Sequence, residues 1–263
     1  MPPITSRVSA GTFRPHRTSN RISSKIIFLS CEGCITEENY FKQVSRLFCE
    51  IESKIQLISV AEDAILTPSK LRTPEQNSML SKTRPKQLVD RIDAFKRDKE
   101  DKFEFSKYPE DEFWIITDVD NNWSDTVIPG NDGKTYIQEW TEAIEMCQER
   151  NYDYAVSNPF FEMWLLLHHD EATDSDKAHA VTDSHAYDSN SGEYFRDRLR
   201  ELSVALKDKK HIKPEHYTVD KIKKAVERAE ILHLDKEDKA PRYYATTVYL
   251  LLNKMMDMLS KNE

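Results

Sequence analysis

Phe113-Trp-Ile-Ile-Thr-Asp118-Val-Asp120 is the stretch that decides the fold of this 263-residue chain. Its four large residues, two of them β-branched, predict a buried strand. Two carboxylates follow with one residue between them, and extended geometry would project both to the same side. Such close like charges repel and lose hydration, and no Lys or Arg lies between Lys107 and Lys134 to offset this. We therefore expect a divalent cation there, with an acid-capped turn as the alternative.

Apolar patterns on either side of this stretch alternate between strand and helix. Lys25–Ser30 and Ile55–Val60 predict further buried strands, and Tyr152–Val156 predicts a short one. Helical spacing of apolar residues is expected to begin near Thr36, Pro85, Tyr136 and Asn158. This β-α-β-α-β-α-β-α order predicts an α/β fold, with a mainly parallel sheet covered by helices on both faces.

A third acid follows the first predicted strand, because Glu32 and Gly33 come directly after it. Sites in parallel sheets gather beyond the carboxyl ends of the strands. If the first and third strands are neighbours, Glu32 would meet Asp118 and Asp120. Three carboxylates offer only oxygen, which suits Mg²⁺ or Mn²⁺ rather than zinc. Such an ion can polarise a phosphate and activate water, whereas the absence of a Walker-type glycine-rich loop argues against ATP hydrolysis.

The block from Asn158 to His168 predicts a buried helix, capped by Asn158 with Pro159 at the first helical position. Glu162 lies in its first turn, where a buried carboxylate is costly unless it is paired or functional. A helix-dipole partner or a salt bridge is the alternative for Glu162. We include Asn158, His168 and Gly33 among the candidates for substrate contact.

Two polar stretches, 61–84 and 170–191, are expected to be loops. Further helical patterns cover 194–206, 219–234 and 243–259. We predict three parts: a basic, flexible N-terminal arm at 1–24, an α/β core at 25–170, and a helical region packed on it at 171–263.

Charge is unevenly distributed along the chain, whose net charge is −8. The first 25 residues contain no acid and five cations, namely Arg7, Arg14, Arg17, Arg21 and Lys25. Of these, Arg14, Arg17 and Arg21 are candidates for contact with nucleic-acid phosphates, although the acidic remainder argues against passive coating of nucleic acid. No apolar run approaches a membrane span, and four cysteines are too few for a disulfide framework. A cytoplasmic protein with reduced thiols is expected.

Three blocks resemble one known family. Glu32-Gly33, followed by Thr36-Glu37 and Asn39-Tyr40-Phe41, resembles the opening signature of RloB-like proteins. Ser157-Asn158-Pro159-x-Phe161-Glu162-x-Trp164-Leu165-Leu166-Leu167-His168 is similar to the family's most recognisable block. Ala245-Thr-Thr-Val-Tyr-Leu-Leu-Leu252 resembles its C-terminal helix, and the whole likeness covers about 20–255.

This resemblance implies a Toprim-related, Rossmann-like fold whose sites hold a divalent metal on a Glu after one strand and an Asp-x-Asp after another. By it, Glu32, Asp118 and Asp120 would bind Mg²⁺ or Mn²⁺, and Glu162 would be an additional catalytic acid. It also implies a role in bacterial anti-phage defence, beside an AAA-type ATPase partner. Cys34 departs from the family pattern, which favours a charged or polar residue there, with little effect on metal binding.

Three functional hypotheses remain. The first is a metal-dependent nuclease acting on DNA or RNA. The second is a thiol redox protein, because Cys31-x-x-Cys34 falls between a strand and a helix, although the intervening Glu32 would raise a thiol pKa. The third is a non-catalytic regulatory subunit of a defence complex. The sequence leaves the substrate and assembly into a homo-oligomer open.

Overall fold

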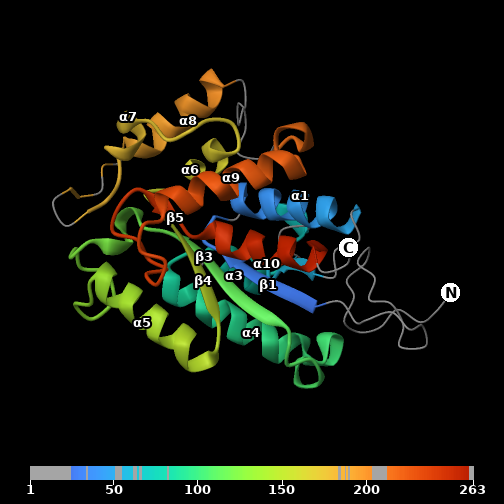
Figure 1. Ribbon diagram of the computed structural model, residues 1–263. Coiled ribbons are helices and arrows are strands. Elements are labelled where there is room, and N and C mark those ends of the chain that lie inside the picture. Colours follow the sequence, from blue (N-terminus) through green and yellow to red (C-terminus); the bar gives the residue numbers. More distant parts are fainter. Residues whose placement is uncertain are drawn as a thin grey trace.

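The computed structural model describes residues 25–33, 35–50, 55–61, 64, 67–81, 83–182, 185–186, 188, 190–202 and 212–260. A five-stranded sheet forms its centre, in the order β2-β1-β3-β4-β5 (Figure 1). Strands β1 to β4 are parallel to one another, and β5 runs antiparallel to β4. The strands are β1 (Lys25–Cys31), β2 (Ile55–Ser59), β3 (Glu112–Asp118), β4 (Asp153–Asn158) and β5 (Ala245–Thr246).

Helices cover both faces of the sheet, so the predicted α/β architecture is confirmed (Figure 1). The α-helices are α1 (Thr36–Glu50), α3 (Pro74–Ser81), α4 (Pro85–Phe103), α5 (Tyr136–Arg150), α6 (Phe161–Leu167), α7 (Asp174–Lys177), α8 (Ser191–Glu201), α9 (Val219–Leu232) and α10 (Val248–Ser260). The 3₁₀ turns are η1 (Ser69–Leu71), η2 (Phe105–Lys107), η3 (Asp120–Trp123) and η4 (Pro214–His216). None of the helices within the described residues combines the length and apolar character needed to cross a membrane.

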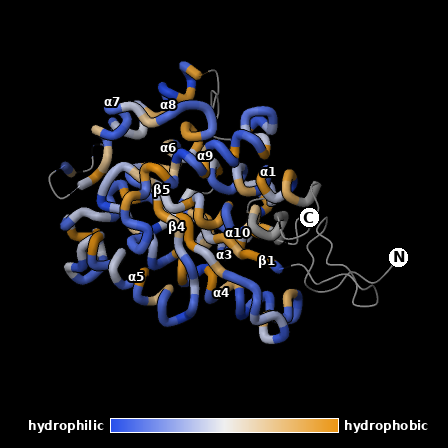
Figure 2. The backbone as a smooth tube through the Cα atoms, in the orientation of Figure 1, coloured by the Kyte–Doolittle hydropathy of each residue, from blue (hydrophilic) through white to orange (hydrophobic). Residues whose placement is uncertain are grey.

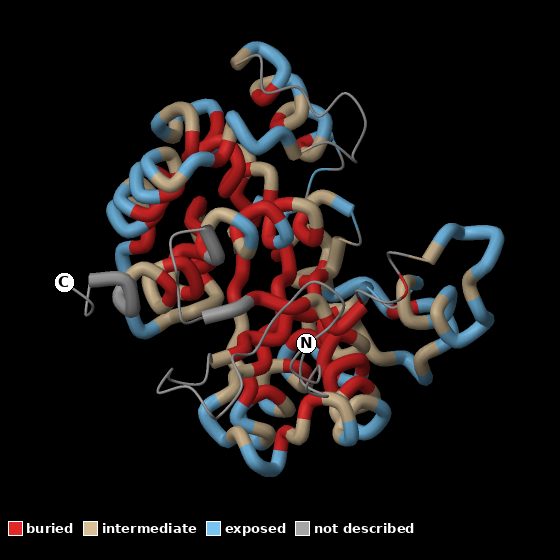
Figure 3. Tube along the Cα trace, turned by 90° about the vertical axis from the view of Figure 1, so that its right-hand side faces the viewer, coloured by how far each residue is buried: buried red, intermediate tan, exposed pale blue. Residues whose placement is uncertain are grey.

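Side chains of β1 alternate between two hydrophobic cores. Ile27 and Leu29 face a core shared with α1, α6, α9 and α10, whereas Ile26 and Phe28 face one shared with α4 and α5. A strand covered on both faces must be apolar throughout, which is why its pattern is a continuous run rather than an alternation. Figures 2 and 3 show hydrophobic, buried residues along the strands and hydrophilic, exposed ones on the outer helices.

The strand order brings the predicted site residues to one edge of the sheet. β1 lies beside β3, with Cys31 opposite Ile116, and β3 lies beside β4, with Asp118 opposite Ser157. All three strands are parallel, so their carboxyl ends meet at that edge. The first and third strands are therefore neighbours, which is the condition under which Glu32 was expected to meet the two aspartates.

Asn158 is not the helix cap that the sequence predicted. It ends β4, is joined to Pro159 by a cis peptide bond, and lies opposite Ala245 of β5. The helix α6 begins only at Phe161. The physical reason is that a residue before proline is biased toward extended backbone, which here favours the strand.

Both stretches that we expected to be loops contain helix. Within 61–84, Thr73 accepts a hydrogen bond from the Gln76 amide at 3.2 Å and so caps α3, whose first residue is Pro74. Within 170–191, α7 is capped by Thr173 and buries Asp176. Both signals, a Thr before a helix start, were present in the sequence and were outweighed by the polar composition.

The two-residue strand β5 was also not expected, since too short a run carries no strand periodicity. It comes from the C-terminal region and extends the same sheet. The basic segment 1–24, with Arg14, Arg17 and Arg21, lies outside the described residues, and so does Cys34. Cys31, the first cysteine of that pair, is buried.

Candidate functional site

Glu32 is fixed against the end of β3 by hydrogen bonds. Its backbone amide donates to the Ile116 carbonyl at 2.9 Å, which continues the β1–β3 pairing one residue beyond β1. Its carboxylate accepts bonds from the Thr117 hydroxyl at 2.5 Å and from the Asp118 amide at 3.0 Å. The acid after the first strand and the acid at the end of the third strand are thus in contact, as their strand order requires.

Asn122 joins the 3₁₀ turn η3 to this contact. Its buried side-chain amide donates to both Glu32 carboxylate oxygens, at 3.3 and 3.4 Å, and to the Asp118 carbonyl at 2.8 Å. Asn122 is not among the residues predicted from the sequence, because an Asn within a polar turn carries no pattern that distinguishes a site residue from a turn former.

Asp120 reaches the site by a different route from the predicted one. The strand ends at Asp118, and Asp120 begins η3 with a φ of +24°, so strand alternation does not place the two side chains. Its Oδ1 accepts a bond from the Asn122 amide at 3.1 Å, and its own amide donates to Pro159 at 3.3 Å. Asp is one of the few residues that tolerate this left-handed region, because its short side chain bonds locally.

The site concentrates carboxylates in a buried setting. Burial raises the pKa of Asp118 well above its usual range, and nearby negative charges raise it further. Those charges belong to Glu37, Glu32, Glu162 and Asp120. Burial, with the charge of Asp120 second, raises the pKa of Glu32 to about 8, and burial raises the pKa of Asp120 to about 6. Among the described residues, ionisation of all three acids is therefore unfavourable, and a nearby positive charge would favour it.

The donor chemistry of this cluster fits a hard divalent cation. Within the described residues, no lysine, arginine or histidine forms an ion pair with Glu32, Asp118 or Asp120. Asp118 Oδ1 is buried and has no hydrogen-bond partner. An orphaned carboxylate oxygen beside further acids is a position that a cation would satisfy.

The side chains do not yet form a metal cage. Across the part of the chain that the structure describes, no three carboxylate, imidazole or thiolate groups lie together as ligands for one ion. The reason lies in the bonds above: both oxygens of Glu32 and Oδ1 of Asp120 are turned toward protein donors. The residues fit a cation in kind, and binding it requires their carboxylates to reorient.

Gly33 precedes α1 and Glu37 lies in its first turn, beside the cluster of Glu32, Asp118 and Asp120. A Cβ atom on Gly33 would lie 1.8 Å from Glu37 Oε2, so the missing side chain leaves room for this carboxylate. In the sequence, Glu37 stands out only as part of the Thr36-Glu37 block, and its influence on Asp118 adds it to the site. Glu162, in the first turn of α6, acts on Asp118 in the same way.

Asn158 and His168 make their bonds within the protein. The Asn158 side-chain amide donates to the Val181 carbonyl at 2.8 Å and to the Pro241 carbonyl at 3.0 Å, and its oxygen accepts from the Val181 backbone amide at 2.8 Å. Tyr40 lies 3.1 Å from His168 Nε2, and burial lowers the pKa of this histidine to about 3. Contact of either residue with substrate stays a prediction, and one that these internal bonds do not favour.

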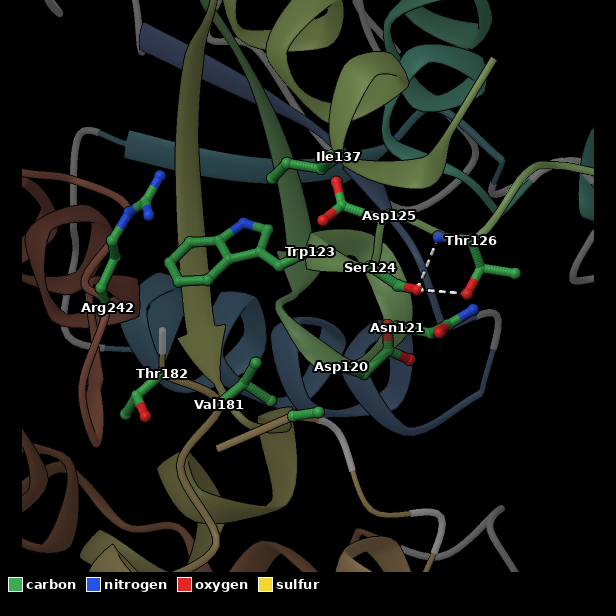
Figure 4. A pocket seen from close by; sticks show the side chains of 11 residues that line it. Asp120, Asn121, Trp123, Ser124, Asp125, Thr126, Ile137, Val181, Thr182 and Arg242 are labelled. Atoms are coloured by element: carbon green, nitrogen blue, oxygen red, sulfur yellow. Dashed lines mark hydrogen bonds between the residues drawn. The ribbon is translucent and has the colours of Figure 1, made fainter. Parts of the chain in front are cut away.

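A cavity of about 630 Å³ adjoins the acids on the side of Asp120 (Figure 4). Trp123 and Arg242 line it, together with polar side chains of η3 and of the turn that follows. Neither residue was singled out from the sequence, because Arg242 is distant along the chain and a single Trp in a turn has no periodic context.

Comparison with known proteins gives one match. The model of the family described as RloB-like protein matches residues 27–255 of the chain, and these include every acid discussed above. No curated protein and no solved structure is significantly similar to the chain.

Proposed function

The chain belongs to the RloB-like protein family, and from the acid cluster within the matched residues we infer that it is a metal-dependent nuclease that hydrolyses phosphodiester bonds of DNA or RNA. The observation that carries this proposal is the buried, unpartnered Asp118 Oδ1 beside Glu32 and Asp120. A structural role alone would normally pair such a group with a protein donor.

In this proposal Mg²⁺ or Mn²⁺ is held by Asp118, Asp120 and Glu32. When bound, the ion would polarise a phosphoryl oxygen and lower the pKa of attacking water. Asn122 and Thr117 orient the Glu32 carboxylate through their hydrogen bonds. Glu162 is the proposed additional acid, placed by α6 so that its charge acts on Asp118.

The biological context of the proposal rests on the family resemblance. We propose that the nuclease is a cytoplasmic effector of bacterial anti-phage defence and that an AAA-type ATPase partner controls it. A partner that reorganises the site would fit the present arrangement, in which the carboxylates accept bonds from protein donors instead of converging on one point.

Cleavage assays test this proposal directly. Plasmid DNA, single strands, bulk RNA and tRNA are incubated with the full chain, with and without the ATPase, in Mg²⁺, Mn²⁺ or EDTA. We expect metal-dependent cleavage that falls about a hundredfold in Asp118→Asn and Asp120→Asn. Asp197→Asn is the control, because Asp197 is half-exposed on α8 and forms an ion pair with Arg200 of the same helix. Equal cleavage by wild type and the two site variants would refute the assignment.

A non-catalytic regulatory subunit is the second candidate. The lack of a ready three-ligand group among the described residues favours it. Under this hypothesis, Glu32→Gln and Asp118→Asn chains would keep full protection against phage in cells, whereas under the nuclease hypothesis they would lose it. A plaque assay with both variants therefore separates the two.

A further inference from the structure

The cavity beside Asp120 is built from segments that are far apart in sequence. One wall is the stretch from Asp120 to Thr126, another is Ile137 at the start of α5, and the third comprises Val181, Thr182, Ala186 and Arg242. Its volume of about 630 Å³ lies within the range of roughly 300–1,000 Å³ found for small-molecule sites. One end is a proposed metal ligand, so whatever fills this cavity lies next to the reacting group.

Trp123 presents an aromatic surface that is held firmly in place. Its ring packs edge-on against Trp140, with centroids 6.2 Å apart, within a small core that includes Val119 and Val156. Figure 4 shows the indole extending from η3 toward Arg242. A partly exposed indole fixed by packing is suited to stack on a planar ligand, because little side-chain entropy is lost on binding.

Arg242 supplies positive charge at the same wall. Its guanidinium lies 5.4 Å from the centre of the Trp123 ring, and it is the single cationic side chain among the described residues that line the cavity. A guanidinium binds phosphate through two parallel hydrogen bonds and also stacks on aromatic rings. The cavity therefore pairs a planar apolar surface with a phosphate-binding group.

We propose that this cavity binds one unpaired nucleotide of a nucleic-acid strand, with its base on Trp123 and a phosphate at Arg242; the inference deepens the proposed nuclease function. Hydroxyls of Ser124 and Thr126 line the polar side and can bond to base or sugar edges. A paired base cannot enter such a cavity without leaving its stack. The substrate class is accordingly single-stranded or locally unpaired DNA or RNA, and intact duplex is excluded.

Binding measured without cleavage tests this inference. Fluorescein-labelled short oligonucleotides of mixed sequence, as RNA, DNA and a matched hairpin duplex, are titrated with the full chain in EDTA and followed by anisotropy. We expect single strands to bind more tightly than the duplex. Trp123→Leu and Arg242→Ala should each weaken single-strand binding about tenfold, because one stacked base or one phosphate contact is lost. Trp123→Phe and Arg242→Lys should retain intermediate affinity.

Arg200→Ala is the matched control, since Arg200 is an exposed cation on α8 that pairs with Asp197. Thermal unfolding of each variant verifies that it is folded, and Trp123→Phe keeps a ring against Trp140 if Trp123→Leu unfolds. Equal affinity of wild type, Trp123→Phe and Arg242→Ala for single strands, or equal binding of duplex, overturns the inference. If Trp123→Phe and Arg242→Ala bind single strands as wild type does and cleavage persists, the cavity inference fails but the nuclease proposal stands. Selective single-strand binding without any cleavage supports the cavity and rejects the nuclease.

Discussion

Glu32 illustrates how one side chain couples two strands and one turn. Its carboxylate accepts from Thr117, from the Asp118 amide and from Asn122, and all three donors lie more than 80 residues away in sequence. Hydrogen bonds of this kind favour the ionised acid, yet burial and the charge of Asp120 outweigh them and raise its pKa to about 8. These donors hold the Glu32 carboxylate in place, and it must exchange at least one of these bonds to bind a cation.

A pH dependence of stability follows from this raised pKa. An acid whose pKa is higher in the folded state contributes stability that is fully present below the unfolded value of about 4 and is lost as pH rises toward the folded value. In EDTA, we expect the free energy of unfolding to fall between about pH 5 and about pH 8 by an amount on the order of 4 kcal/mol. Glu32, Asp118 and, up to about pH 6, Asp120 cause this fall.

Urea unfolding at several pH values measures this effect. Glu32→Gln has no titrating group at position 32, so its stability should depend less on pH. Near pH 8 its free energy of unfolding should exceed that of wild type. Glu149→Gln is the control, because Glu149 is exposed on α5. A wild-type profile that is flat or that rises across this range would contradict the pKa assignment.

At the scale of elements, the short strand β5 attaches the C-terminal region to the sheet through Thr247. The Thr247 amide donates to the Val156 carbonyl at 2.9 Å. Its hydroxyl accepts from the Val156 amide at 2.9 Å and donates to the Lys239 carbonyl at 3.0 Å. A single buried hydroxyl therefore replaces the ladder bonds that so short a strand cannot supply.

Thr247→Val should destabilise the fold by about 1–3 kcal/mol, because the same volume is kept while the buried Val156 amide loses its acceptor. Thr247→Ser keeps the hydroxyl and should lose about 1 kcal/mol or less. Thr141→Val is the control, because Thr141 is exposed on α5 and its hydroxyl donates to the Ile137 carbonyl of the same helix. Chemical denaturation measures all three, and a loss equal to that of Thr141→Val would show that the attachment carries no energy.

Sequence predicts these elements according to how much local pattern each contains. The continuous apolar runs of β1 and β3 and the helical stripes of α4 and α5 mark long elements buried on a known side, and the structure confirms them. β5 and the Asn158–Pro159 junction depend on tertiary partners that no local window contains. At the site, the strand ends predict where Glu32 and Asp118 meet. Tertiary packing, in contrast, decides the turn that contains Asn122 and the position of Arg242, which is distant along the chain.

At the scale of the whole molecule, the two ends of the sheet treat their acids differently. At the amino ends, Glu112 of β3 pairs with Lys25 and Lys254, and Asp153 of β4 pairs with Lys254 and Lys239. Although burial acts against it, the lysine bonds hold the pKa of Glu112 below its usual range. At the carboxyl ends, no such cation pairs with Glu32, Asp118 or Asp120 within the described residues. The described residues supply no countercharge at that end, and a proton or a bound cation can provide it.

This asymmetry predicts that Mg²⁺ or Mn²⁺ stabilises the folded chain. At a free cation concentration of about one hundred times Kd, mass action adds about 2.7 kcal/mol to the free energy of unfolding. Asp118→Asn should lose this response and, without cation, should be more stable than wild type by about 1 kcal/mol, because a repelled buried charge is removed. Asp153→Asn is the matched control, because Asp153 lies at the amino end of β4, on the opposite edge of the sheet. Because Asp153→Asn breaks ion pairs with two lysines, this variant should be less stable than wild type yet keep the full cation response. Thermal unfolding in Mg²⁺ and in EDTA distinguishes Asp118→Asn from Asp153→Asn. A response absent from wild type would mean that no cation binds, and one lost equally in Asp153→Asn would place the cation elsewhere than at the carboxyl ends of β1 and β3.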